Sequence, residues 1–188
     1  MGALAAGVAA TCIACSGGGG PVAVVGDSIT YQTRDHLDED VQWDVAASIG
    51  ATAAQMLPEA QRLAGAVPSQ AIINLGTNDA LQQVPAAETE ATLEAIVGAF
   101  DDGRCVHLVT IGTQLPDSGD PPAGSTAREL NDWMRRFADD HDDVHVIDWD
   151  REVSAEAGSE LLLDDMIHPN NPGRERLAEM MAEAVDGC

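Results

Sequence analysis

A serine and a histidine stand in the sequence where they could serve as nucleophile and base. Ser28 lies in "VAVVGDSITY" (22–31), where an apolar run meets Gly26 and Asp27 and a helical pattern follows without a spacer. A serine at such a corner often only caps the helix, by accepting a backbone N–H bond. If the corner instead presents Ser28 as a nucleophile, the chain must also supply a base, a group that orients the base and an oxyanion site.

The segment "DDMIHPNNPG" (164–173) supplies the candidate base. His168 follows Asp165 by three residues, in a polar loop before the last helical pattern. A carboxylate at this spacing can fold back to accept the Nδ1–H of the ring, which would fix the tautomer and leave Nε2 free as a general base. Asp164 could take the same part, and either acid could instead only solvate the loop.

Two further segments offer donors for an oxyanion. Asn78 in "NLGTNDA" (74–80) could point its side-chain amide at a developing negative charge. The alternative is an Asn and Asp turn that satisfies only its own backbone. Gly50 in "ASIGATAAQM" (47–56) has no side chain, so its backbone N–H could approach a ligand closely, although a glycine by itself marks only a turn.

Together the four segments resemble the SGNH (GDSL-type) hydrolases, whose name lists Ser, Gly, Asn and His. "GDSIT" matches the first block, with Ile29 in place of the commoner leucine, and "SIGATA" matches the second. "GTND" (76–79) and "DMIHPN" (165–170) match the third and fourth. All four occur in the family's order, and the resemblance spans about residues 21–186.

The resemblance implies a role for each matching residue. Ser28 would attack an ester carbonyl, His168 would take the hydroxyl proton and later return it to the leaving alcohol, and Asp165 would orient His168. The backbone N–H groups of Ser28 and Gly50, with the Asn78 side chain, would form the oxyanion hole. This chemistry needs no cofactor and no metal, and the sequence has no His, Cys and Asp cluster with the spacing of metal ligands.

Strand-like runs recur along the chain, and the segments above follow or end them. Three of the five runs are almost continuously apolar, which is typical of strands covered on both faces. In an open α/β sheet the site lies outside the carboxyl ends of the strands, so we expect these segments to meet at one edge. The runs are 21–26, 41–47, 70–76, 105–112 and 143–149.

Helical spacing occupies the stretches between and after the strand-like runs. This alternation predicts a three-layer α/β/α domain with a mainly parallel five-stranded sheet in a flavodoxin-like order. The segment 113–126 is rich in proline and glycine, and we expect an irregular loop there. The expected helices are 29–39, 52–66, 86–101, 125–140 and 171–186.

The composition indicates a single folded domain and argues against one class of partner, nucleic acid. A chain of 188 residues with 45% hydrophobic residues suits one folded domain with a sizeable core. A net charge of −23 argues against a nucleic-acid partner, because a polyanion would be repelled and no basic patch could release its counterions.

The first 20 residues differ from the rest. A short apolar run and a Gly-rich stretch precede Asp27, the first charged residue. The run is shorter than the ~20 apolar residues that span a bilayer. It looks like the apolar part of an export signal without the usual positive region, and Cys15 resembles the acylated cysteine of a bacterial lipoprotein. The alternative is a disordered tail with incidental cysteines. We therefore expect a leader and tether over 1–20, a hydrolase domain over 21–188, export, and a possible membrane tether through Cys15.

The remaining cysteines and histidines have mostly structural interpretations. The last helix should return Cys188 to the edge where Cys105 begins a strand, so a disulfide between them and two separate buried thiols both stay open. Trp149 is expected to pack beneath the site, with a place in the acyl pocket as the less favoured alternative. The other histidines are expected in strands (His107 and His145) or on solvated helix faces (His36 and His141).

The family resemblance implies a carboxylic ester as substrate and leaves its size open, since one fold supports many activities. No long apolar lid is visible, which favours a shallow site and a small acyl group, such as acetyl on a carbohydrate. Acyl transfer to a sugar hydroxyl through the same acyl-enzyme is one alternative, and a non-catalytic binding module is another. We expect a monomer.

Overall fold

The computed structural model describes residues 20–100, 103–116, 119–155 and 158–188. Its centre is a sheet of five strands in the order β2-β1-β3-β4-β5, and all neighbouring strands are parallel. This confirms the predicted flavodoxin-like order. The strands are β1 (Val22–Gly26), β2 (Trp43–Ala47), β3 (Gln70–Asn74), β4 (Val106–Val109) and β5 (Val144–Ile147).

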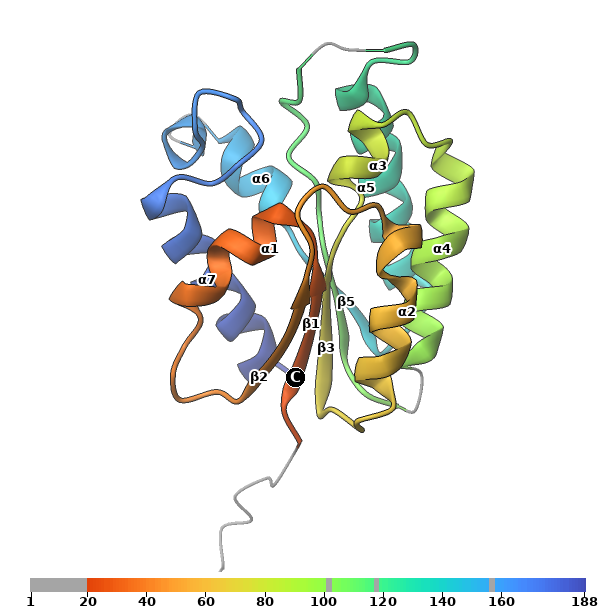
Figure 1. Cartoon of the computed structure of the whole chain (residues 1–188), viewed down its shortest axis with the longest axis vertical. Helices are drawn as coiled ribbons and strands as arrows, with labels where there is room; N and C mark the ends of the chain where they lie inside the picture. The colour runs from red at the N-terminus through yellow and green to blue at the C-terminus, as the bar shows by residue number, and fades with distance from the viewer. Residues whose placement is uncertain (1–19, 101–102, 117–118, 156–157) are drawn as a thin grey trace, which may run out of the picture.

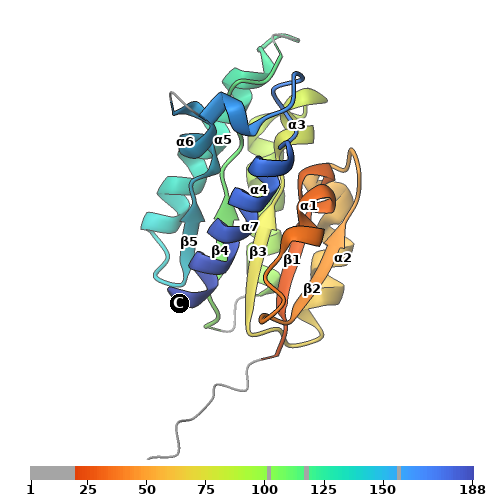
Figure 2. The same ribbon diagram turned by 90° about the vertical axis from the view of Figure 1, so that its left-hand side faces the viewer.

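Helices cover both faces of the sheet and complete the predicted three layers (Figure 1). The helices α2 (Ala53–Ala64), α4 (Ala86–Ala99) and α5 (Ala123–Asp139) lie on one face. The helices α1 (Ser28–Thr33), α6 (Trp149–Ser154) and α7 (Asn171–Asp186) lie on the other, as the turned view in Figure 2 also shows. Among the described helices, none combines the length and the apolar character that a membrane crossing requires.

The two cores follow from the alternation of side chains along the strands. In β1, Ala23 and Val25 pack into the core beneath α2, α4 and α5, whereas Val22 and Val24 pack into the core beneath α7. Every residue of β1 is buried, so a strand covered on both faces explains the unbroken apolar run in the sequence.

Several short elements differ from the prediction. The structure adds α3 (Thr77–Leu81) and α6, each too short to produce a helical period in the sequence, as well as two 3₁₀ turns at Arg34–His36 and Gly158–Leu161. The predicted loop 113–126 is wrong at its end, because α5 already begins at Ala123. Pro122 directly precedes this helix and has the extended conformation of an N-cap residue.

A disulfide joins Cys105, which precedes β4, to Cys188, which follows α7, with a Cα–Cα distance of 6.4 Å. Of the two alternatives for these cysteines, the structure therefore favours the bonded pair. The leader expected over 1–20, Cys15 included, lies outside the described residues apart from Gly20.

Trp149 is 1% exposed and belongs to the core beneath α7, as predicted. His107 is buried within β4, and burial together with the neighbouring His145 lowers the pKa of His107 to about 4, so its ring is neutral at pH 7. His145 in β5 is exposed, and the exposed His141 bonds the backbone oxygen of Phe137.

Candidate active site

The corner between β1 and α1 depends on Gly26. A Cβ atom built on Gly26 would collide with the side chain of Thr30, because α1 starts directly after the strand and folds back over it. Asp27 is the N-cap of this helix: its Oδ1 accepts the backbone N–H of Ile29 at 2.9 Å. The capping role therefore belongs to Asp27, and the Ser28 hydroxyl is left for another partner.

That partner is His168, which lies 140 residues further along the chain. The Oγ of Ser28 and the Nε2 of His168 are 3.0 Å apart. The Nδ1 of the same ring lies 2.8 Å from Oδ2 of Asp165. With Nδ1–H donated to the carboxylate, Nε2 carries a lone pair and can accept the proton of the Ser28 hydroxyl.

The loop around Asp165 is built to hold this geometry. Its Oδ1 accepts the backbone N–H groups of Ile167 and His168, each at 2.9 Å, while Oδ2 faces the ring. Burial is the largest single influence on the Asp165 carboxyl and acts to raise its pKa, but the hydrogen bonds from His168 and Ile167 and the charge of His168 together outweigh it, so the pKa is lowered on balance. Met166 between them has a φ of 58°, a conformation that the surrounding hydrogen bonds maintain. Of the two acids considered, Asp165 contacts the ring, and Asp164 is exposed.

The oxyanion candidates flank the same corner. The backbone N–H of Ser48 bonds the carbonyl of Gly26 at 3.1 Å, which brings the loop that carries Gly50 alongside the corner. Gly50 has a φ of 75°, a value that favours glycine. Asn78, in the first turn of α3, donates its Nδ2 to Oδ2 of Asp27 at 2.9 Å. Their role as oxyanion donors stays a prediction.

Asp27 is the most strongly perturbed acid at the site. It is 1% exposed, and its burial raises the pKa of the carboxyl to about 6, although the bonds from Ile29 and Asn78 and the charge of His168 act in the opposite direction. Asp27 directly precedes Ser28 and accepts the side-chain amide of Asn78, so it holds these two groups in place.

Two polar side chains that the sequence analysis did not single out fix the Gly50 loop. Gln82 donates its Nε2 to the carbonyl oxygen of Gly50 at 2.9 Å. Asp79, which is buried, accepts the N–H of Ala53 at the start of α2 at 3.0 Å and the hydroxyl of Thr89 at 3.3 Å. Asp79 directly follows Asn78 and Gln82 lies four residues after it, so proximity to the "GTND" block was the available signal.

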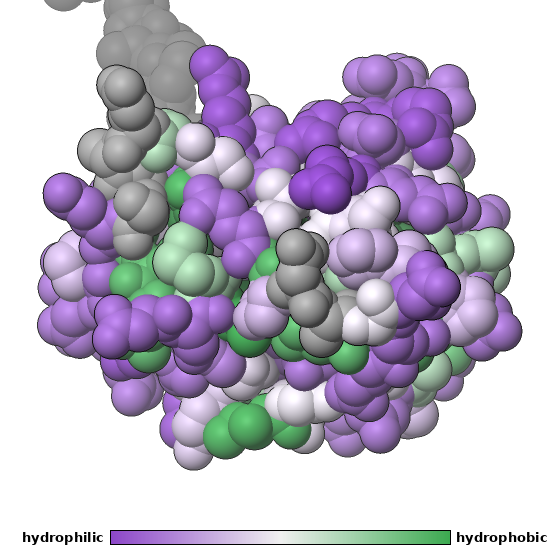
Figure 3. Space-filling view, turned by 90° about the horizontal axis from the view of Figure 1, so that it is seen from above, coloured by the Kyte–Doolittle hydropathy of each residue, from purple (hydrophilic) through white to green (hydrophobic). Residues whose placement is uncertain are grey.

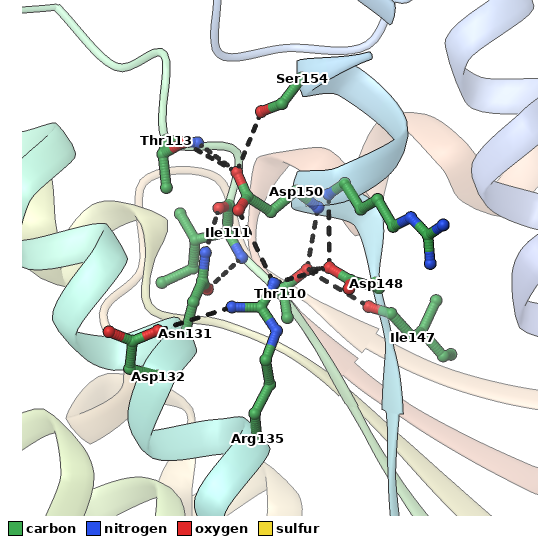
Figure 4. A network of polar contacts seen from close by, with 11 residues as sticks. Thr110, Ile111, Thr113, Asn131, Asp132, Arg135, Ile147, Asp148, Asp150 and Ser154 are labelled. Carbon is green, nitrogen blue, oxygen red and sulfur yellow. Dashed lines mark hydrogen bonds and ion pairs between the residues drawn. The ribbon is translucent and has the colours of Figure 1, made fainter.

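A network of polar contacts lies where β4 and β5 end (Figure 4). Asn131 of α5 bonds both the N–H and the carbonyl of Ile111, each at 2.7 Å. The Cδ1 of Ile111 would lie 2.7 Å from a Cβ on Gly76, which has a φ of 108° and precedes α3. Glycine is therefore required at the turn that leads to Asn78. The other members of the network are Thr110, Thr113, Asp132, Arg135, Ile147, Asp148, Asp150 and Ser154.

The rim at this edge is mostly hydrophilic with apolar residues between the polar ones (Figure 3). Three exposed large hydrophobic residues belong to the segments of the site: Tyr31 in α1, Ile49 beside Gly50, and Leu163, whose N–H bonds the carbonyl of His168. A substrate at Ser28 would meet both kinds of surface.

The comparisons with known proteins concern the family and the fold of the chain. Residues 24–176 match the sequence profile of the GDSL-like Lipase/Acylhydrolase family. No curated protein is similar enough to the chain to count as a match.

The solved structures similar to this chain include a lipase/acylhydrolase, an esterase and an O-acetyltransferase domain, all from bacteria. The lipase/acylhydrolase from Enterococcus faecalis has a TM-score of 0.78 and 21% identity, over 89% of this chain and 96% of that chain. The psychrotrophic esterase EstA from Pseudoalteromonas sp. has a TM-score of 0.67 and 18% identity, over 89% and 97%. The catalytic domain of the peptidoglycan O-acetyltransferase OatA from Streptococcus pneumoniae has a TM-score of 0.73 and 16% identity, over 90% and 94%.

Proposed function

The chain belongs to the GDSL-like lipase/acylhydrolase family and is an ester hydrolase, and we propose that it removes small acyl groups, such as acetyl, from carbohydrates through an acyl-enzyme. The observation that carries the proposed mechanism is the chain of two short contacts from Ser28 through His168 to Asp165, at 3.0 and 2.8 Å. A non-catalytic binding module has no use for a base aimed at a serine.

In the first half of the reaction, the Oγ of Ser28 attacks the ester carbonyl carbon while its proton passes to Nε2 of His168. The carbonyl oxygen becomes an oxyanion, which the N–H groups of Ser28 and Gly50 and the Asn78 amide stabilise. Asp165 compensates the positive charge that forms on the ring. The intermediate then collapses, and His168 gives its proton to the departing alcohol.

In the second half, a water molecule takes the place of the alcohol. His168 accepts a proton from the water, whose oxygen attacks the acyl carbon. Collapse of this second intermediate breaks the bond to Ser28, and the proton returns to Oγ. The products are the free acid and the regenerated serine, and the residues of this chain suffice for each proton transfer.

The exposed setting of the site supports a small acyl group. The Asp165 side chain is 42% exposed and that of His168 is 26% exposed, so the base lies close to solvent. Such a rim suits a short acyl chain on a polar alcohol better than a long acyl chain, whose apolar surface would need an enclosed pocket.

An ester panel tests this function. We expect p-nitrophenyl acetate to be hydrolysed faster than the octanoate and the palmitate, and an acetylated oligosaccharide to release acetate. The Ser28→Ala and His168→Ala variants should lose activity by roughly three orders of magnitude or more, while Ser125→Ala, at an exposed position of α5, should keep it. Faster cleavage of the long chains would overturn the proposed substrate class. Fluorophosphonate labelling that persists in Ser28→Ala would overturn the nucleophile.

Acyl transfer is the second candidate. It is suggested by the O-acetyltransferase domain, which shares the fold of this chain at 16% identity. A sugar hydroxyl would replace water in the second half of the same reaction. Product analysis with an added alcohol acceptor separates the two: a new ester indicates transfer, and free acid alone indicates hydrolysis.

We also propose that the protein is exported and held at the cell surface through Cys15. The disulfide between Cys105 and Cys188 supports an oxidising compartment. Cell fractionation of the native chain and of Cys15→Ser tests this proposal, since loss of the acylated cysteine should release the protein from the membrane fraction.

A further inference from the structure

Three side chains with metal-binding atoms meet at the edge of the sheet opposite the candidate active site. Cys105 precedes β4, His145 lies on β5, and Cys188 follows α7. The two Sγ atoms and a ring nitrogen of His145 all lie within 4.8 Å of one another. Figure 2 shows the C-terminus at this edge, beside the start of β5.

The distances suit a tetrahedral metal site. With Zn–S bonds of ~2.3 Å and Zn–N bonds of ~2.0 Å, two ligand atoms of such a site lie roughly 3.5–3.8 Å apart. The Sγ of Cys188 and the Nε2 of His145 are 3.4 Å apart. Only the bond between the two sulfurs keeps the cysteines from acting as thiolate ligands.

A second histidine faces this cluster with an unused ring nitrogen. Gln70 donates its Nε2 to the carbonyl of Val185, so its Oε1 is the atom that lies 2.9 Å from Nε2 of His107. His107 must therefore carry its proton on Nε2, and Nδ1 holds a lone pair. His107 is 2% exposed, and among the described residues its Nδ1 has no hydrogen-bond partner.

There is space for a ligand between these groups. A cavity of about 160 Å³ is lined by His107, His145 and Cys188, with Val146, Ala184 and Gly187 completing its wall. His107 and His145 are register partners in β4 and β5, and their ring centroids are 5.5 Å apart. The lone pair of His107 is buried and has no donor, and its ring shares this cavity with the imidazole of His145 and with Cys188, which is a polar environment that suits a soft divalent cation.

We propose that the reduced chain binds one zinc ion here, through Cys105, Cys188 and His145, with His107 in the wall of the adjoining cavity. The site and the disulfide exclude each other, so metal binding depends on the oxidation state of the two cysteines. A dithiol reduces the disulfide and becomes a disulfide itself, leaving two thiols. Zinc binding then displaces one proton from each thiol as the two metal–sulfur bonds form.

The experiment uses the full chain with Cys12→Ser and Cys15→Ser, which removes the other two cysteines. This protein is reduced with dithiothreitol, freed of reductant without oxygen, and titrated with Co²⁺ and then with Zn²⁺. We expect one equivalent of Co²⁺ to give thiolate-to-metal charge-transfer absorption and the visible bands of a tetrahedral site, both lost when Zn²⁺ is added. The oxidised protein should show neither.

Substitutions identify the ligands. Cys105→Ser and Cys188→Ser should abolish the charge-transfer absorption, while His145→Ala and His107→Ala should each weaken Zn²⁺ affinity by about tenfold or more. His141→Ala, which removes an exposed histidine that does not line this cavity, should change nothing. Far-ultraviolet circular dichroism and hydrolysis of p-nitrophenyl acetate report whether each reduced protein is folded. A reduced chain that binds no metal, or binds it equally well without His145, overturns the proposal.

Discussion

The Asn78 side chain donates one N–H of its amide to Oδ2 of Asp27, at 2.9 Å. An amide NH₂ has two donors, so this bond fixes the orientation of the group and leaves one N–H for a developing oxyanion. Asp27 also caps the helix that begins with Ser28, through the N–H of Ile29. One buried carboxylate therefore holds both the helix that begins with Ser28 and the amide of Asn78, the proposed nucleophile and the proposed oxyanion donor.

The pKa of Asp27 predicts how stability depends on pH. Burial raises this pKa from 3.8 to about 6, so the folded protein binds a proton more tightly than the unfolded chain does. The stabilisation from the protonated acid is complete below pH ~4 and is lost as pH rises through ~6, by roughly 3 kcal/mol. Asp27→Asn should remove this decline in denaturant titrations between pH 4 and 7, whereas Asp140→Asn, at an exposed position, should keep it. The variant's kcat should fall, because the new amide cannot accept both N–H groups. An unchanged pH profile would contradict the raised pKa.

Two adjacent acids give a matched test of the group that orients His168. Asp165→Asn should lower kcat by ~10²–10⁴-fold, because an amide facing Nδ1 no longer enforces the tautomer with a free Nε2. Asp164→Asn changes the charge equally at an exposed neighbour and should leave kcat within about twofold. Steady-state kinetics on p-nitrophenyl acetate measure both. Equal losses in the two variants would point to a general charge effect.

The bond from Gln82 to the carbonyl of Gly50 predicts a smaller effect. A single hydrogen bond of this kind contributes about 0.5–1.5 kcal/mol, so Gln82→Ala should lower kcat roughly two- to tenfold with little change in KM. We expect kcat to fall because the loss of this bond leaves the Gly50 N–H less well oriented toward the oxyanion that forms in the transition state. Gln42→Ala, which lies in an exposed loop before β2, serves as the control. A loss expressed only in KM would show that Gln82 contacts the substrate instead.

The disulfide predicts a change in stability without a change in chemistry. Its two cysteines are 83 residues apart, and closing a loop of this length stabilises a fold by about 4 kcal/mol in the chain-entropy account. Cys105→Ser should lower the free energy of unfolding by up to this amount in metal-free buffer. The kcat of the folded variant should stay unchanged, because the cysteines lie at the edge opposite Ser28. Thermal unfolding with and without reductant measures the effect on the native chain.

Much of the fold follows from local sequence. The buried strand β1 and the helix α7 have apolar periods of their own, and alternation of such elements leaves few arrangements of a parallel sheet. Ser28, Asn78, Asp165 and His168 could be singled out from the sequence because each lies in a short block that matches the order of the family's motifs. The three-residue spacing also indicated that Asp165 could fold back onto His168, with Asp164 as the alternative, and the structure shows the contact with Asp165.

What the sequence left open depends on contacts between distant segments. In the sequence, Asn131 looks like an ordinary residue of a helix. In the structure, its side chain in α5 bonds the backbone of Ile111, which follows β4. The choice between Asp164 and Asp165 depends on a turn with a positive φ at Met166, which no period in the sequence reveals. Likewise, the pKa of Asp27 is raised by burial. This burial depends on the tertiary structure and not on the residues next to Asp27 in the sequence.

The separation of 140 positions between Ser28 and His168 has a consequence for biosynthesis. A ribosome delivers the nucleophile early and the base late, so a nascent or truncated polypeptide that stops short of the imidazole carries only an ordinary alcohol. Ester cleavage can therefore begin only once almost the entire domain has been synthesised and assembled. A fragment that ends before His168 lacks the general base and should not cleave esters.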